Sequence, residues 1–201
     1  MSVEVVLAPG LWMPRAAMSV LDVRLARHGY RVRTFPYRGR APFDANVDAL
    51  ARFAGAGAFF VGHSLGGVLI LEMLNRHPEV NAQGAVLLGS PVRGCLAGRR
   101  FGSARLGRWM MGGCRELWDE RPARWTRRAP LGVIAGTTPF GLGRMVNGRL
   151  PGPNDGVVCV DETTVEGMTE RALVAQGHST LIVSARVSEL VQRFCNSGRF
   201  Q

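Results

Sequence analysis

The apolar positions along this chain follow two kinds of pattern. Continuous or alternating apolar runs predict strands, and apolar residues recurring every three or four positions predict helices. The predicted strands lie at residues 3–7, 30–37, 58–62, 85–88, 131–135 and 172–175, and the predicted helices at 14–28, 64–75 and 180–194. Asp44 is expected to cap a further helix that carries Val47, Leu50 and Phe53.

Several of these predicted strands are apolar throughout, which is typical of parallel strands buried on both faces. Strands that alternate with helices indicate βαβ units. The pattern therefore predicts an α/β fold: a doubly wound, mostly parallel sheet of about six strands with helices on both faces. With 201 residues, the chain suits a single domain spanning residues 1–201.

One junction between a predicted strand and a predicted helix carries the sequence GHSLG, at residues 62–66. In this context G-x-S-x-G is typical of a turn so sharp that larger flanking side chains would collide. The serine then stands exposed beside a helix N-terminus, whose dipole favours a neighbouring anion. We therefore expect Ser64 to be a nucleophile; the alternative is a structural tight turn.

A serine hydroxyl is a weak nucleophile and needs a base. Of the four histidines, His28 and His77 end predicted helices and are expected to be C-terminal capping residues. His63 adjoins the serine, but strand alternation points its side chain elsewhere, so we expect it to pack against or shape the pocket. His178, in the loop before the last predicted helix, is the expected base. The alternative for His178 is a polar loop residue that caps that helix.

The base needs a carboxylate to orient it, and two aspartates follow the serine at suitable places. Asp155 lies in the turn-prone sequence Asn-Asp-Gly, which can aim a carboxylate inward. Asp161 is followed by Glu162, and this pair indicates solvated or helix-starting charge. We favour Asp155 and keep Asp161 as the alternative. The chain order is then Ser, Asp, His.

The negative oxygen that forms when a serine attacks a carbonyl needs backbone N–H donors. Leu65, directly after Ser64, is one expected donor. Leu11, in the turn APGLW after the first predicted strand, is the other. Trp12 and His63 are expected at the substrate-binding site.

The motifs GHSLGG, PGLW, and NDGVV followed by QGHS resemble those of the α/β-hydrolase superfamily, in particular its small bacterial lipase- and esterase-like serine hydrolases. The resemblance covers residues 3–196. It implies Ser64 as nucleophile, Asp155 as acid and His178 as base. One departure is Pro9-Gly10, where relatives commonly have His-Gly; support of that loop by a histidine side chain is lost, which concerns substrate range more than catalysis.

The resemblance also implies an activity. The expected enzyme cleaves the carboxylic ester of a small acyl or lipid substrate through an acyl-enzyme, with the N–H groups of Leu11 and Leu65 as oxyanion donors and no metal or organic cofactor. The alternatives are a thioesterase or acyltransferase with the same triad, and a non-catalytic lipid-binding or partner-binding module on the same fold.

The distribution of charge identifies one more segment, which contains none of these motifs. The net charge of +10 comes from 25 arginines and no lysine. Residues 93–128 hold ten of these arginines together with Trp109, Trp118 and Trp125, which predicts a cap-like insertion. We favour a solvated helical cap whose tryptophans face the core. The alternative is a peripheral contact with an anionic lipid surface, which interleaved arginine and tryptophan are suited to bind. Nucleic acid is a less favoured partner because no nucleic-acid-binding module accompanies the charge.

Compartment is predicted from what the sequence lacks. No apolar run approaches the roughly 20 residues that span a bilayer, and the first residues do not follow the pattern of a signal peptide. The spacing of the four cysteines, Cys95, Cys114, Cys159 and Cys195, is not that of a metal site and indicates reduced structural thiols. We expect a cytoplasmic protein and keep a peripheral contact with the membrane as an alternative; its oligomeric state is left open.

Overall fold

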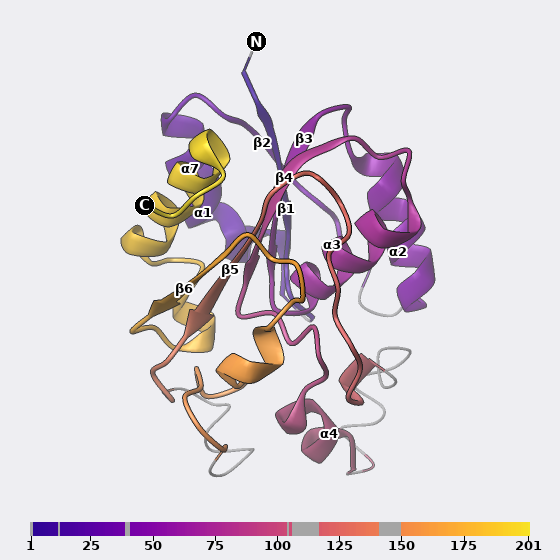
Figure 1. The fold of residues 1–201 in the computed structure, drawn as a ribbon, viewed down its shortest axis with the longest axis vertical. Coiled ribbons are helices and arrows are strands. Elements are labelled where there is room, and N and C mark those ends of the chain that lie inside the picture. The colour runs from indigo at the N-terminus through magenta and orange to yellow at the C-terminus, as the bar shows by residue number, and fades with distance from the viewer. Residues whose placement is uncertain (1, 12, 39–40, 104, 106–116, 141–149) are drawn as a thin grey trace.

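A six-stranded parallel sheet forms the centre of the protein in the computed structural model, which describes residues 2–11, 13–38, 41–103, 105, 117–140 and 150–201 (Figure 1). The strand order is β2-β1-β3-β4-β5-β6, and every neighbouring pair is parallel. This confirms the predicted doubly wound fold. The strands are β1 (Glu4–Ala8), β2 (Arg31–Thr34), β3 (Ala58–His63), β4 (Ala82–Leu88), β5 (Leu131–Gly136) and β6 (Glu170–Val174).

Helices cover both faces of this sheet (Figure 1). Helices α1 (Ser19–Arg27) and α7 (Ala185–Ser197) lie on one face, and α2 (Phe43–Phe53) and α3 (Leu65–Arg76) lie on the other. The central strands are apolar throughout because their side chains alternate between two cores. In β1, Val5 and Leu7 enter the core beneath α1 and α7, whereas Val6 and Ala8 enter the core beneath α2 and α3.

Several predicted element ends differ from the structure. The second strand stops at Thr34 instead of residue 37, and the chain then turns toward α2. Asp44 does not cap α2; Pro42 is the N-cap residue, and the Asp44 carboxylate pairs with Arg76 of α3 at 2.6 Å. The last helix begins at residue 185, not 180, because the short 3-10 turn η4 (His178–Thr180) precedes it.

The described part of the Arg/Trp-rich segment, residues 93–128, packs against the rest of the protein. It contains α4 (Leu96–Ser103), at the end of the sheet where the strands finish (Figure 1). Trp118 and Trp125 are both buried in the core beneath α2 and α3. These two tryptophans are therefore not available to a lipid surface. Trp109 lies outside the described residues, and both the cap and its membrane contact stay predictions.

The described residues contain neither a membrane-spanning helix nor a cluster of metal-binding side chains. There, no helix has the length and apolar character to cross a membrane, and no group of three or more His, Cys, Asp or Glu side chains is arranged to hold a metal ion. Cys95, Cys159 and Cys195 are free thiols; Cys114 lies outside the described residues.

Candidate active site

The junction between β3 and α3 is strained at Ser64. Its backbone has φ 53° and ψ −124°, and it is the one non-glycine residue with positive φ among the described residues. Such a conformation costs on the order of 1–3 kcal/mol and persists only where the surroundings enforce it. Here the Ser64 N–H donates to the Leu88 carbonyl at 2.9 Å, which ties the turn to the end of β4.

Close packing explains the glycines on either side of Ser64. A Cβ atom on Gly62 would lie 2.5 Å from the backbone nitrogen of Gly67. A Cβ atom on Gly66 would lie 2.1 Å from the carbonyl oxygen of Ala8, at the end of β1. Neither neighbour is a side chain that can move away. The turn can therefore be this sharp only with glycine at both positions.

The predicted base and the favoured acid are in direct contact. His178 Nδ1 lies 2.7 Å from Asp155 Oδ2, and the His178 N–H donates to the Asp155 carbonyl at 2.9 Å. Asp155 is 1% exposed, and its other carboxylate oxygen accepts bonds from the N–H groups of Val157 (3.0 Å) and Val158 (2.7 Å). These bonds stabilise the carboxylate and orient it toward the imidazole.

The rival acid is elsewhere. Asp161 lies exposed in the 3-10 turn η3 (Val160–Thr163), and its side chain is not the partner of His178. Of the two alternatives for its neighbour Glu162, solvated or helix-starting charge, the structure shows the second, because Glu162 lies in the first turn of η3. Glu162 accepts bonds from the N–H groups of Leu96 (2.6 Å) and Cys159 (2.8 Å), and burial raises its pKa. Glu162 therefore joins η3 to the start of α4.

Two glycines that the sequence analysis did not single out make room for the His178–Asp155 pair. Gly89, directly after β4, has φ 52°, and a Cβ atom there would lie 2.9 Å from Asp155 Oδ2 and 3.3 Å from His178 Nδ1. A Cβ atom on Gly136, the last residue of β5, would lie 2.8 Å from Asp155 Cβ. The available signal was a glycine at the carboxyl end of each apolar run.

His63 is a buried neighbour of His178 in the His178–Asp155 pair. Its side chain is 1% exposed, its Nε2 lies 3.0 Å from the His178 carbonyl oxygen, and its ring centroid lies 4.7 Å from that of His178. Because a carbonyl only accepts, Nε2 carries the proton and donates. Burial, followed by repulsion from His178, lowers the pKa of His63 to about 3. The expected direct contact of His63 with a substrate does not fit this burial; its packing beside Ser64 does.

The turn after β1 lies directly against Ser64. A Cβ atom on Gly10 would be 3.1 Å from Ser64 Cβ, so the backbone that leads into Leu11 passes the serine closely. Leu65 is the first residue of α3, and the first N–H groups of a helix have no partner within it. Both residues are therefore placed near Ser64, and their role as oxyanion donors stays a prediction. Trp12 lies outside the described residues.

His178 is hydrogen-bonded to Asp155 but not to Ser64. Among the described side chains, the Ser64 hydroxyl makes no hydrogen bond with the His178 ring. His63 links the two, because it precedes Ser64 in the chain and contacts His178. With Nδ1 facing Asp155, Nε2 is the ring nitrogen of His178 left for the serine. Such contacts are often long without substrate and tighten when it binds.

This chain resembles known proteins both in sequence, through one protein family, and in fold, through solved structures. Residues 5–188 match the model of one protein family, described as the alpha/beta hydrolase family. Among the curated proteins, no sequence matches the chain.

Solved structures share the fold across almost the whole chain. A pyrethroid hydrolase from Sphingobium faniae JZ-2 has a TM-score of 0.60 at 15% identity, covering 98% of each chain. An esterase from Rhodococcus sp. ECU1013 has a TM-score of 0.67 at 16% identity, covering 98% of this chain and 91% of that one. A bromoperoxidase from Bacillus anthracis has a TM-score of 0.68 at 15% identity, with coverages of 98% and 93%. At these identities the likeness concerns the fold alone.

Proposed function

Because the chain belongs to the alpha/beta hydrolase family, we propose that it is a serine hydrolase that cleaves carboxylic esters through an acyl-enzyme. One observation carries this proposal. The pair of partly exposed His178 and buried Asp155 lies at the carboxyl edge of the sheet, beside the strained turn that presents Ser64. A structural turn alone would need neither the strain nor the oriented imidazole.

In the first half of the reaction, the Ser64 oxygen attacks the ester carbonyl while His178 Nε2 takes the hydroxyl proton. Asp155 holds the imidazole by its Nδ1 proton and stabilises the positive charge that the ring acquires. The N–H groups of Leu11 and Leu65 stabilise the negative carbonyl oxygen, each contributing roughly 10²- to 10³-fold in turnover. The C–O bond to the alcohol then breaks, and His178 returns the proton to the departing alcohol.

In the second half, water replaces the alcohol. His178 takes a proton from the water, which attacks the acyl-serine carbonyl. The carboxylic acid leaves, and the proton returns to Ser64. The same residues serve both halves, so the proposed reaction needs no metal or organic cofactor.

Intact-mass analysis after treatment with a fluorophosphonate tests this proposal without assuming a substrate. We expect one covalent adduct on the wild-type protein and none on Ser64→Ala, because only an activated serine reacts at the phosphorus. Ser90→Ala is the matched control, since Ser90 is buried beside the same junction and is no part of the proposed reaction; this variant should still be labelled. An unlabelled, folded wild-type protein would contradict the proposal.

The labelled site then allows the acyl substrate to be identified. Matched p-nitrophenyl esters and thioesters of increasing acyl length, offered to wild type and Ser64→Ala, separate an esterase from a thioesterase. Product analysis with an added alcohol detects acyl transfer. Preference for thioesters, or for transfer to the alcohol over water, would replace the ester hydrolase with one of these alternatives.

A further inference from the structure

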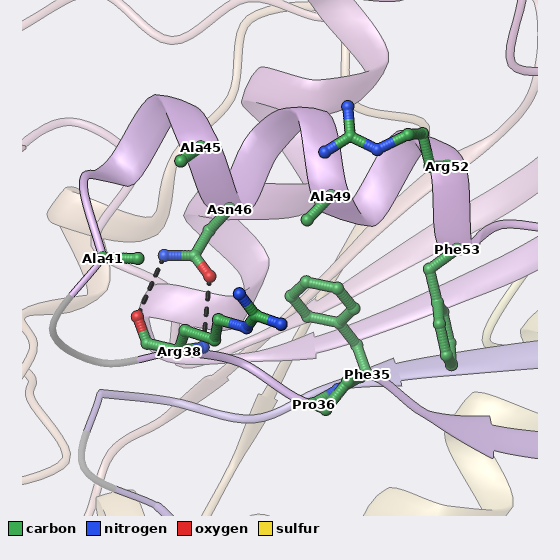
Figure 2. A pocket seen from close by; sticks show the side chains of 9 residues that line it. All are labelled: Phe35, Pro36, Arg38, Ala41, Ala45, Asn46, Ala49, Arg52 and Phe53. Atoms are coloured by element: carbon green, nitrogen blue, oxygen red, sulfur yellow. Dashed lines mark hydrogen bonds between the residues drawn. The ribbon is translucent and has the colours of Figure 1, made fainter.

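A cleft lies between α2 and the chain segment that follows β2 (Figure 2). We call it the α2 cleft; Phe35, Arg38, Ala45, Ala49 and Arg52 are among the residues that line it. Its volume of about 500 Å³ lies within the range of roughly 300–1,000 Å³ that is usual for small-molecule sites. No residue of the candidate active site lines it, and β1 separates β2 from the strand that leads to Ser64.

A buried side chain fixes the two walls of the α2 cleft relative to each other. Asn46 of α2 is 1% exposed, and its amide accepts from the Arg38 N–H at 3.1 Å and donates to the Arg38 carbonyl, also at 3.1 Å. A further bond reaches the Pro42 carbonyl at 3.3 Å. These bonds fix the loop to the helix, as Figure 2 shows. The cleft therefore exists before any ligand arrives, which reduces the ordering cost of binding.

The lining combines an apolar surface with small residues. Phe35, which is only 3% exposed, forms the floor of the cleft and packs edge to face against Phe53, with ring centroids 5.5 Å apart. Ala45 and Ala49 are four residues apart on α2 and face the same side. Because their side chains are single methyl groups, they leave the space beside Phe35 open (Figure 2). An apolar body fits this space.

Two guanidinium groups, Arg38 from the loop and Arg52 from α2, belong to this lining (Figure 2). Neither makes an ion pair with a carboxylate of the described residues. The acids of α2 have other partners: Asp44 pairs with Arg76, and Asp48 contacts His77. Among the described residues, the two positive charges of the cleft therefore have no ion-pair partner.

Another acid, which is linked to the cleft residue Phe53 through Arg33, is also occupied. Glu4 of β1 pairs with both Arg31 and Arg33, and the Arg33 guanidinium stacks over the Phe53 ring at 4.0 Å. Glu4 is thus unavailable to Arg38 or Arg52. Guanidinium groups bind carboxylates and phosphates through paired N–H donors. One ligand can satisfy both features of the cleft: an anionic group binds the two guanidinium groups, and an apolar body contacts the apolar lining.

We propose that the α2 cleft binds a small amphiphilic anion, with its apolar body against Phe35 and the two alanines and its anionic head between Arg38 and Arg52. A carboxylate and a phosphate monoester share this head-group chemistry. The proposal does not depend on hydrolysis at Ser64.

Calorimetric titration of the Ser64→Ala protein tests the proposal, since this variant separates binding from turnover. The probes are decanoate and decyl phosphate, each below its micellar concentration, with decanol as the uncharged counterpart. We expect at least one anion to bind with one-to-one stoichiometry and at least tenfold more tightly than decanol. Binding of decanoate alone identifies a carboxylate ligand, and binding of decyl phosphate alone identifies a phosphate ligand. No binding of either anion, or equal binding of decanol, overturns the proposal.

Variants distinguish the cleft from general attraction to a basic protein. Arg38→Gln with Arg52→Gln should weaken anion binding at least tenfold. The matched control, Arg27→Gln with Arg193→Gln, removes two exposed arginines from α1 and α7, on the other face of the sheet, and should leave binding unchanged. Ala49→Leu, which keeps both charges but fills the cleft, should also weaken binding. Equal losses in the cleft and control pairs overturn the proposal; thermal unfolding checks that each variant is folded.

Discussion

Asp155 has both carboxylate oxygens engaged, one by His178 and the other by two backbone N–H groups. This arrangement fixes which nitrogen of His178 holds a proton. A carboxylate only accepts, so Nδ1 must donate to it, and Nε2 keeps the lone pair that a general base needs. The burial of Asp155 keeps water from competing for the Nδ1 proton.

Replacing this carboxylate separates the two candidate acids. Asp155→Asn should lower kcat for ester hydrolysis by roughly 10⁴-fold, because an amide can donate to the ring and stabilise the wrong tautomer. Asp161→Asn should leave kcat within about twofold, since Asp161 is exposed and is not the partner of His178. Steady-state kinetics on both variants checks this, and the opposite ranking would remove Asp155 from the mechanism.

At this scale the sequence identified residues with local signals and missed those defined by distant partners. Asn154-Asp155-Gly156 indicated an inward carboxylate, and the structure shows that turn, with Gly156 donating to the Asn154 side chain at 3.0 Å. The bond from His63 to His178 joins residues 115 positions apart, and no local pattern indicates it. Gly89 and Gly136 likewise matter because residues distant in sequence, Asp155 among them, pack against them.

Secondary-structure elements were predictable where burial sets the pattern. The central strands bury both faces, so their apolar runs marked them clearly. Element ends depend on neighbours instead: Asp44 turns to Arg76 of α3 rather than capping its own helix, and a 3-10 turn delays α7. The α2 cleft also could not be predicted from the sequence, because it depends on hydrogen bonds from Asn46 to the loop after β2.

Glu162 links two elements and gives a prediction at their scale. Its carboxylate accepts the first N–H of α4 and the N–H of Cys159. Glu162→Ala should lower the free energy of unfolding by about 1–3 kcal/mol, because both donors lose a charged acceptor. Asp161→Ala, at the exposed neighbouring position, should change it by no more than about 0.5 kcal/mol. Urea denaturation measures both; equal midpoints for Glu162→Ala and wild type would show that the link contributes nothing.

The whole molecule should respond to acid through His63. Burial lowers its pKa from 6.5 to about 3 in the folded protein, so the unfolded chain takes up the proton first as the pH falls. The stability that neutral His63 contributes is complete above pH 6.5 and is lost progressively as the pH falls toward 3. The expected slope reaches about 1.4 kcal/mol per pH unit within this window.

His63→Gln provides the comparison, because its amide N–H can still donate to a carbonyl but does not titrate. Urea denaturation of both proteins at several pH values between 7 and 4 should show a steeper loss for wild type. Other titrating groups contribute to both curves alike and cancel in the difference. Parallel curves would mean that His63 titrates normally or that its site relaxes on protonation.

The order of the strands has a consequence for when the site comes into being. Ser64 lies in the first third of the chain, whereas His178 follows β6, the last strand to be synthesised and the outermost of its half of the sheet. A nascent chain that has folded only through β4 already has the partners of the Ser64 turn, but not the imidazole. Contacts this distant in sequence form late. Labelling of Ser64 should therefore appear only when the far edge of the sheet has docked, which makes it a reporter of completed folding.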